Sequence, residues 1–175
     1  MTYPSAPSIR MTFGALWLAL FLACGATTDS RPPAPTPAGW HHWVQGALAF
    51  DSPSDWSVAS RPVVGDFVDI FLSRREDGKN RCVLVLRLSA MPRFPAMERM
   101  KPFAGLAYDT RIGGALARRI DAPEAQLPGT SEGLIELGGS GPARRVHFQY
   151  AHLDAPTRQA AEQVLASLRA PAPRD

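Results

Sequence analysis

The chain of 175 residues has little cysteine and little net charge: it contains Cys24 and Cys82 and carries a formal charge of +3 at pH 7. Its apolar run at residues 13–23 is shorter than the roughly 20 apolar residues that a membrane-spanning helix needs. The sequence also lacks a phosphate-binding loop, a dinucleotide fingerprint and a spaced set of metal ligands. The small charge gives no reason to expect a nucleic-acid partner, and the missing motifs predict a protein without a cofactor.

The composition is that of a folded protein. Apolar residues make up 45% of the chain and charged residues 20%, values that argue against global disorder. At this length there is room for one domain with short appendages.

The N-terminal segment has the pattern of a secretion signal. The run FGALWLALFLA follows Arg10 and fits the apolar region of a signal peptide. Starts at Met1 and at Met11 both retain this run, although a start at Met11 omits Arg10. We therefore expect residues 1–23 to be a signal peptide.

The end of the apolar run, LFLACG at residues 20–25, resembles the lipobox of bacterial lipoproteins. In that family the cysteine is diacylated and becomes the mature N-terminus, which would place the lipid on Cys24. The small residues on either side of the cysteine fit the pattern, whereas Phe21 and Leu22 depart from it. Because two acyl chains hold a protein stably on a membrane, the resemblance implies a membrane-anchored lipoprotein of the cell envelope.

Residues 24–39 are expected to form the lipidated cysteine and a proline-rich tether. The stretch ATTDSRPPAPTPAG has no apolar periodicity, and its prolines favour an extended spacer of about 3.1 Å per residue. The alternative to lipidation is ordinary signal cleavage near Ala23 or Ala26, which would leave a secreted, soluble protein.

The folded domain is expected at residues 40–171, with a C-terminal tail at 172–175, and its clearest element is a hairpin at residues 66–89. Two runs with period-two alternation flank a polar segment that contains Asp77-Gly78, a strong signal for a β-hairpin turn. One face of the second strand is expected to carry Cys82, Leu84, Leu86 and Leu88. Apolar residues also occur on the opposite face, which predicts a sheet covered on both sides.

Further strands are predicted on either side of this hairpin. A short strand to Phe50, a Ser-Pro turn and a second strand from Trp56 should precede it. Residues 115–120, 133–137 and 144–152 should follow it as strands, the last two joined by a glycine-rich turn.

Two helices are also predicted. Met97 and Met100 lie at helical spacing after Pro95, and Pro102 should kink or end this helix because it lacks a backbone donor. The second helix should begin at an N-cap, Asp154. Its apolar stripe comprises Ala161, Val164, Leu165 and Leu168.

The order of these elements resembles the PsbP-like fold. The opening ALAFDSPSDWSV, with its pattern apolar-x-x-Pro-x-x-Trp, the first hairpin, a central helix, a late hairpin and the closing AEQVLASLR carry the likeness over residues 47–169. The fold is named for an extrinsic subunit of photosystem II and is shared by a Ran-binding factor and by mycobacterial lipoproteins of the LpqN type. The resemblance implies an α+β domain, an α/β/α sandwich with a central antiparallel sheet. It implies no catalytic residues, and the characterised members mostly bind or dock other proteins.

Several residues could suggest chemistry, but their surroundings favour structural roles. Adjacent His41 and His42 cannot both face one way on a strand, and no third metal ligand is spaced to join them. Residues 129–133 match G-x-S-x-G, but a nucleophile elbow needs a strand before the serine, whereas a strand-like segment follows it here. We expect His147 at the surface and Cys82 as a buried, inert thiol.

Four basic residues at the tip of the first hairpin form a candidate contact surface: Arg74, Arg75, Lys79 and Arg81. The ordinary explanation is a solvated turn that keeps the domain soluble. The functional alternative is contact with anionic headgroups near the anchor or with an acidic partner.

Together these features predict a lipid-anchored protein of the cell envelope that binds or docks another protein and is not an enzyme. The alternative is a carrier that holds a small apolar ligand or a lipid in a pocket between sheet and helix.

Overall fold

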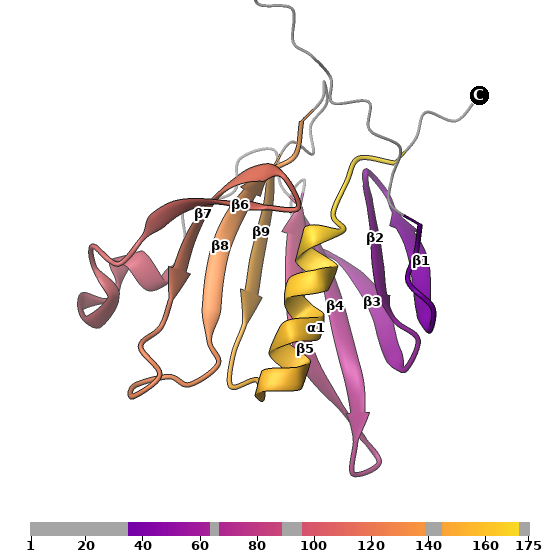
Figure 1. Cartoon of the computed structure of the whole chain (residues 1–175), viewed down its shortest axis with the longest axis horizontal. Helices are drawn as coiled ribbons and strands as arrows, with labels where there is room; N and C mark the ends of the chain where they lie inside the picture. The colour runs from indigo at the N-terminus through magenta and orange to yellow at the C-terminus, as the bar shows by residue number, and fades with distance from the viewer. Residues whose placement is uncertain (1–34, 64–66, 89–95, 139–144, 172–175) are drawn as a thin grey trace, which may run out of the picture. The chain divides into compact units, whose positions relative to one another are not determined.

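The computed structural model describes residues 35–63, 67–88, 96–138 and 145–171. The expected signal peptide, Cys24, the first part of the tether, the glycine-rich turn and the C-terminal tail lie outside these residues. The described residues form an α+β domain that is mostly antiparallel sheet with one α-helix (Figure 1). Within them, no helix is long and apolar enough to cross a membrane.

Seven strands form one antiparallel sheet in the order β3-β4-β5-β9-β8-β7-β6. They are β3 (Trp56–Val63), β4 (Phe67–Glu76), β5 (Lys79–Leu88), β6 (Tyr108–Ile112), β7 (Ala115–Asp121), β8 (Ser131–Glu136) and β9 (Arg145–Tyr150). A separate hairpin is made of β1 (Trp40–Gln45) and β2 (Leu48–Pro53). The strands predicted before and after the first hairpin are thus confirmed, with shifts of a few residues at their ends.

The predicted hairpin is confirmed as β4 and β5. The two strands pair from Val68 with Leu88 to Glu76 with Lys79. Asp77 and Gly78 form its turn with φ of 50° and 75°. Positive φ at both turn residues matches the right-handed twist of the strands that they join, which explains the Asp-Gly pair.

A bulge near the tip of this hairpin overturns the prediction that Cys82 is buried. Leu72 lies opposite Leu84, but Ser73 lies opposite Cys82, so the register shifts between the two pairs. The extra residue on β5 is Val83, which is 4% exposed, whereas Cys82 is exposed. A bulge reverses the alternation of the strand beyond it, and period-two counting from Leu84 therefore assigns Cys82 to the wrong face.

The helix α1 (Ala155–Ala166) lies across one face of the sheet, which we call the helix face (Figure 1). Asp154 caps it as predicted, accepting a hydrogen bond from the Thr157 backbone N–H at 2.8 Å. The predicted stripe is confirmed as buried, although Leu168 lies just beyond the last helical residue. The stripe packs with sheet and hairpin residues in the main core, which includes Leu48, Phe50, Ile70, Leu72, Leu86, Val146 and Phe148.

The segment expected to form the central helix instead forms two 3-10 helices, η1 (Ala96–Arg99) and η2 (Lys101–Phe103), which corrects that prediction. Pro102 lies within the first turn of η2 and cannot supply the backbone N–H that an α-helix through this segment would need. Met97 and Phe103 nevertheless point inward, packing with Ile120 and Ala122. These residues lie on the sheet face opposite α1, which we call the outer face.

The two ends of the described chain come together on β2. Asp51 accepts hydrogen bonds from Thr36 at 3.2 Å and from Arg169 at 3.2 Å, and Ala49 bridges to Arg169. His42, on β1, contacts the same carboxylate at 2.7 Å, whereas His41 lies on the other face of β1 and meets the Trp43 ring edge-on, with ring centres 6.4 Å apart. The aromatic segment thus packs at the domain edge, as predicted.

Candidate functional site

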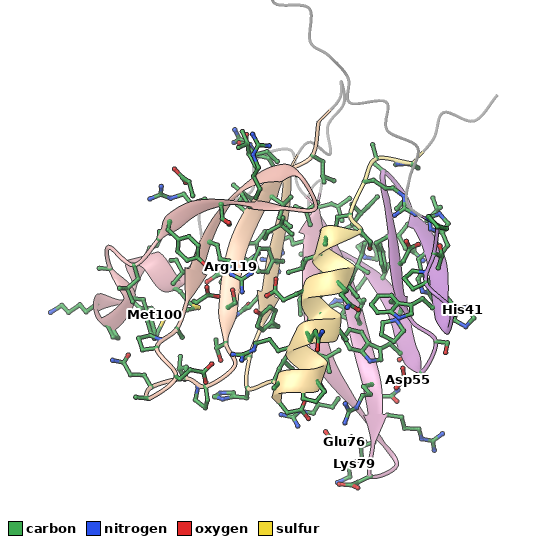
Figure 2. All side chains as sticks on the ribbon, in the orientation of Figure 1. His41, Asp55, Glu76, Lys79, Met100 and Arg119 are labelled. Carbon is green, nitrogen blue, oxygen red and sulfur yellow. The ribbon has the colours of Figure 1, made fainter. Side chains whose placement is uncertain are left out.

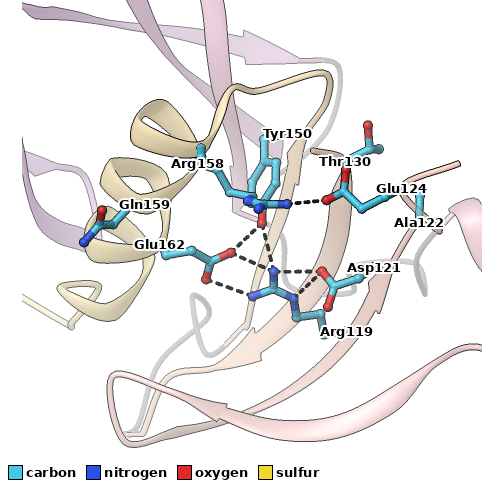
Figure 3. Close-up of a pocket in the computed structure, with 10 residues that line it drawn as sticks. Arg119, Asp121, Ala122, Glu124, Thr130, Tyr150, Arg158, Gln159 and Glu162 are labelled. Carbon is cyan, nitrogen blue, oxygen red and sulfur yellow. Dashed lines mark hydrogen bonds and ion pairs between the residues drawn. The ribbon is translucent and has the colours of Figure 1, made fainter. Parts of the chain in front are cut away.

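A cleft of about 520 Å³ lies between α1 and strands β7 and β9 of the sheet (Figure 3). Its lining is mainly polar and charged. Its charged and phenolic lining residues are Arg119, Asp121, Glu124, Tyr150, Arg158 and Glu162.

Gly133 on β8 leaves room for the Phe148 ring that lies beneath Arg119. Gly133 lies on the helix face, and a Cβ atom at this position would lie 2.5 Å from the ring of Phe148. The Phe148 ring therefore occupies the space above Gly133, and the Arg119 guanidinium lies over that ring, 5.9 Å from its centre. This side of α1 consequently faces an arginine instead of a continuous apolar surface.

Arg119 is the centre of the site. Its side chain is 13% exposed, and its Nη1 and Nη2 donate to the two carboxylate oxygens of Glu162 at 2.8 Å and 2.7 Å. Its Nε donates to Asp121 at 2.8 Å, and Nη2 also donates to the Tyr150 hydroxyl at 2.8 Å. A planar guanidinium can serve both carboxylates at once because its donors form a rigid fork. Arg119 thus ties β7 to α1.

Two tyrosines complete the network. Tyr150 donates its hydroxyl hydrogen to Glu162, and Tyr108, on β6, donates to Asp121. Each carboxylate therefore accepts hydrogen bonds from the guanidinium and from one phenol. The network links three strands of the sheet, β6, β7 and β9, to the single helix.

The pKa values follow from this arrangement. Burial alone would lower the pKa of Arg119, but its bonds to Glu162 and Asp121 raise that pKa above its ordinary value. Burial would raise the pKa of Asp121, yet Tyr108 and Arg119 together hold it below its usual range. Burial and the bond to Glu162 raise the pKa of Tyr150. Near neutral pH Asp121 is therefore ionised, Arg119 is charged, and the Tyr150 phenol is neutral.

A second ion pair lies at the mouth of the cleft. Arg158 on α1 contacts Glu124 at 2.5 Å, with side chains 41% and 65% exposed. The cleft thus offers partly exposed carboxylates around a mostly buried cation. An apolar ligand would have to strip water from these charged groups without replacing their hydrogen bonds.

The predicted contact surface at the β4–β5 tip is only partly available. Arg74 donates to the Thr157 hydroxyl at 2.8 Å, which joins the hairpin to the start of α1. Arg81 donates to Glu76 at 3.0 Å and to a backbone carbonyl. Arg75 and Lys79 are exposed, and Lys79 lies at the tip together with Glu76 (Figure 2).

His147 is not at the surface, which corrects that prediction. It lies on the outer face, 15% exposed, with Nε2 2.6 Å from the carboxylate of Glu132. Glu132 is 1% exposed and also accepts the Met97 backbone N–H at 2.8 Å, so it holds η1 against the sheet. The G-x-S-x-G serine, Ser131, begins β8, so the strand follows it and the elbow geometry is absent at this site.

A row of charges crosses the outer face beside His147. Arg61, Asp69, Arg87 and His147 lie directly opposite one another on four neighbouring strands. Arg87 donates to both oxygens of Asp69 at 2.6 Å and 2.9 Å, and this bonding holds the pKa of Asp69 below its usual range despite burial. Across the described ranges, no group of three or more His, Cys, Asp or Glu side chains is placed to hold a metal ion.

No protein-family model matches the sequence, and neither the curated proteins nor the solved structures yield a match. What the protein does must therefore be inferred from its own residues.

We predict that Arg119→Met lowers the free energy of unfolding by about 2 kcal/mol, because it leaves Glu162 and Asp121 without their shared cation. Urea denaturation of the full chain measures this change. The matched control is Arg158→Met, which removes the same group from an exposed ion pair and should cost no more than about 0.5 kcal/mol. Equal losses in the two variants would contradict a special role for Arg119.

The stability should also depend on the ionisation of Tyr108. Its burial and its bond to Asp121 raise its pKa from 10.0 to about 12. Because the folded-state pKa lies above the unfolded value, this contribution is fully present below pH 10.0 and is lost as the pH rises towards 12. In that window the free energy of unfolding should fall more steeply for the wild type than for Tyr108→Phe, as measured by urea denaturation at a series of pH values. Parallel slopes would show that Tyr108 ionises as an ordinary tyrosine.

Proposed function

We propose that the protein is a lipid-anchored component of the cell envelope whose domain docks another protein and catalyses no reaction. Support for the anchor comes from the apolar run, the lipobox-like residues around Cys24 and the proline-rich tether. For the domain we propose the finer PsbP-like assignment, an α/β/α sandwich. It is supported by the buried Phe50 and Trp56 of the opening segment and by the order of hairpin, hairpin and closing helix.

The observation that carries the docking proposal is the position of the β4–β5 tip. Thr36 and Arg169 meet at Asp51, so the chain enters and leaves the domain in one region. The turn at Asp77-Gly78 projects from the end of the sheet away from the closing segment at Arg169 (Figure 1). A strand advances about 3.3 Å per residue, so the ten residues of β4 span roughly 30 Å from Phe67 to the tip at Glu76.

A tether that ends near Asp51 would therefore present the tip away from the anchored end of the domain. This geometry favours a protein partner over headgroups of the same membrane. Arg75 and Lys79 supply exposed positive charge there, and complementary charge speeds association and suppresses wrong partners. We infer that the partner offers an acidic surface.

The carrier alternative receives less support from the described cleft. Its volume is in the range of ligand pockets, but such pockets are lined mainly by apolar side chains. Here the lining includes Arg119, Asp121 and Glu162. An apolar ligand or a lipid chain would displace water from these charged groups without replacing its hydrogen bonds, which opposes binding.

The proposal is tested by co-purification of the full chain from detergent-solubilised membranes. The double variant Arg75→Ser/Lys79→Ser should bind the recovered partner roughly fivefold more weakly at low salt, because two rim contacts are lost. The control variant Arg99→Ser/Lys101→Ser removes two exposed charges from η1 and η2 and should bind as the wild type does. Cys24→Ala should move the protein from the membrane to the soluble envelope fraction.

Three results would overturn parts of this proposal. Retention of the Cys24→Ala variant on the membrane would show that a lipid on Cys24 is not the anchor. Equal partner binding by the tip and control variants would show that the tip is a solvated turn and not a contact surface. If the wild type binds protein-free anionic vesicles, the tip variant does not, and no protein partner is recovered, the tip contacts the membrane instead of a protein.

A further inference from the structure

One edge of the seven-stranded sheet is left open at β6. Within the described ranges β7 pairs with one side of β6, and no strand pairs with the other side. The opposite edge strand, β3, contains Pro62, which has no backbone N–H to offer a further strand. β6, with sequence YDTRI, has no proline. Of the two edges, β6 is therefore the better template for another strand.

The register of the β6–β7 hairpin shows which backbone groups of β6 face outward. Gly113 and Gly114 form a two-residue turn with φ of 58° and 87°, and Ile112 lies opposite Ala115. Such a turn makes the flanking pair a hydrogen-bonded one, and bonded and non-bonded pairs then alternate. Thr110 thus bonds to β7, whereas the N–H and C=O groups of Asp109 and Arg111 point to the open edge.

The sequence of β6 is complementary to itself in an antiparallel pair. If two copies align about Thr110, each Asp109 lies opposite Arg111 of the other copy, and each Tyr108 lies opposite Ile112. We propose that β6 pairs with β6 of a second copy of this chain, joining two sheets across a twofold axis at Thr110. The four outward backbone groups of each strand are then satisfied by four hydrogen bonds, two on each side of the axis.

The charged side chains of β6 are available for this pairing. Asp109 is 81% exposed and makes only a long contact to Arg118, at 3.4 Å. Arg111 is exposed and donates to the Gly114 carbonyl of its own turn. Opposite charges directly across a strand pair stabilise it. Ile112, which would lie opposite Tyr108, is 8% exposed and packs in the core of its own domain, so the complementarity comes from the charged pair.

The expected interface is small. A strand of five residues buries less than the roughly 1,000 Å² of a stable protein interface. Pairing is therefore expected at high local concentration, such as attachment to a common surface provides. The pairing follows from β6 alone and does not depend on the docking function proposed above.

A cysteine at the twofold axis tests the pairing. In the full chain carrying Cys82→Ser, Thr110→Cys should form disulfide-linked dimers on mild oxidation, because Cα atoms in a non-bonded pair lie about 4.5 Å apart, within disulfide range. Leu116→Cys, an exposed position one strand inward on β7, is the control and should cross-link at least about tenfold more slowly. Equal rates, or no cross-linking of Thr110→Cys, would overturn the proposal.

Charge reversal tests the register. Asp109→Arg and Arg111→Asp, each added to Thr110→Cys, place like charges opposite one another on both sides of the axis and should slow cross-linking. The combined reversal restores complementarity and should recover most of the rate. Recovery in the combined variant would also show that misfolding was not the reason for slower cross-linking in the single variants. Failure to recover would overturn this register.

Discussion

The bond between Arg119 and Glu162 is the interaction on which the arrangement of this domain depends. Half of the helix face is apolar, and there α1 packs on Ile70, Leu86 and Val146. Around Gly133 and Arg119, an ionic network takes the place of apolar packing. The helix is thus held by apolar packing along one side and by ionic bonds along the other, and the cleft described above lies on the ionic side.

The position of α1 in turn fixes the ends of the domain. Ser167, just after the helix, accepts the Asp51 backbone N–H at 2.9 Å, and Arg169 then bridges to Ala49 on β2. These contacts bring the closing segment to the place where Thr36 meets Asp51. Neither the β4–β5 tip nor the outward edge of β6 takes part in these contacts, and both remain available to a partner.

Much of the fold could be predicted from the sequence because its signals are local. The Asp77-Gly78 turn and the Asp154 cap act within a few residues, and they are correct in the structure. Features that depend on distant residues were missed. The bulge that exposes Cys82 shifts the register by one residue without altering the apolar pattern, and His147 is half-buried beside Glu132, a contact between two strands that the sequence does not indicate.

The site itself was not predicted, although one signal was present. Strand alternation over residues 115–121 places Arg119 on the face of Ala117, a core residue, and two positions before Asp121. An arginine at an inward strand position requires a buried partner, but the sequence does not say that the partner is Glu162, 43 residues further on. That pairing arises only when the helix packs on the sheet.

The most direct test of the ionic cross-link is a double-mutant cycle between Arg119 and Glu162. The free energies of unfolding of the wild type, Arg119→Met, Glu162→Leu and the double variant would be compared by urea denaturation. We expect a coupling energy of about 1–2 kcal/mol, since the second substitution should cost little once the partner is gone. A coupling energy within about 0.3 kcal/mol of zero would mean that the two side chains act independently and that α1 is held by apolar packing alone.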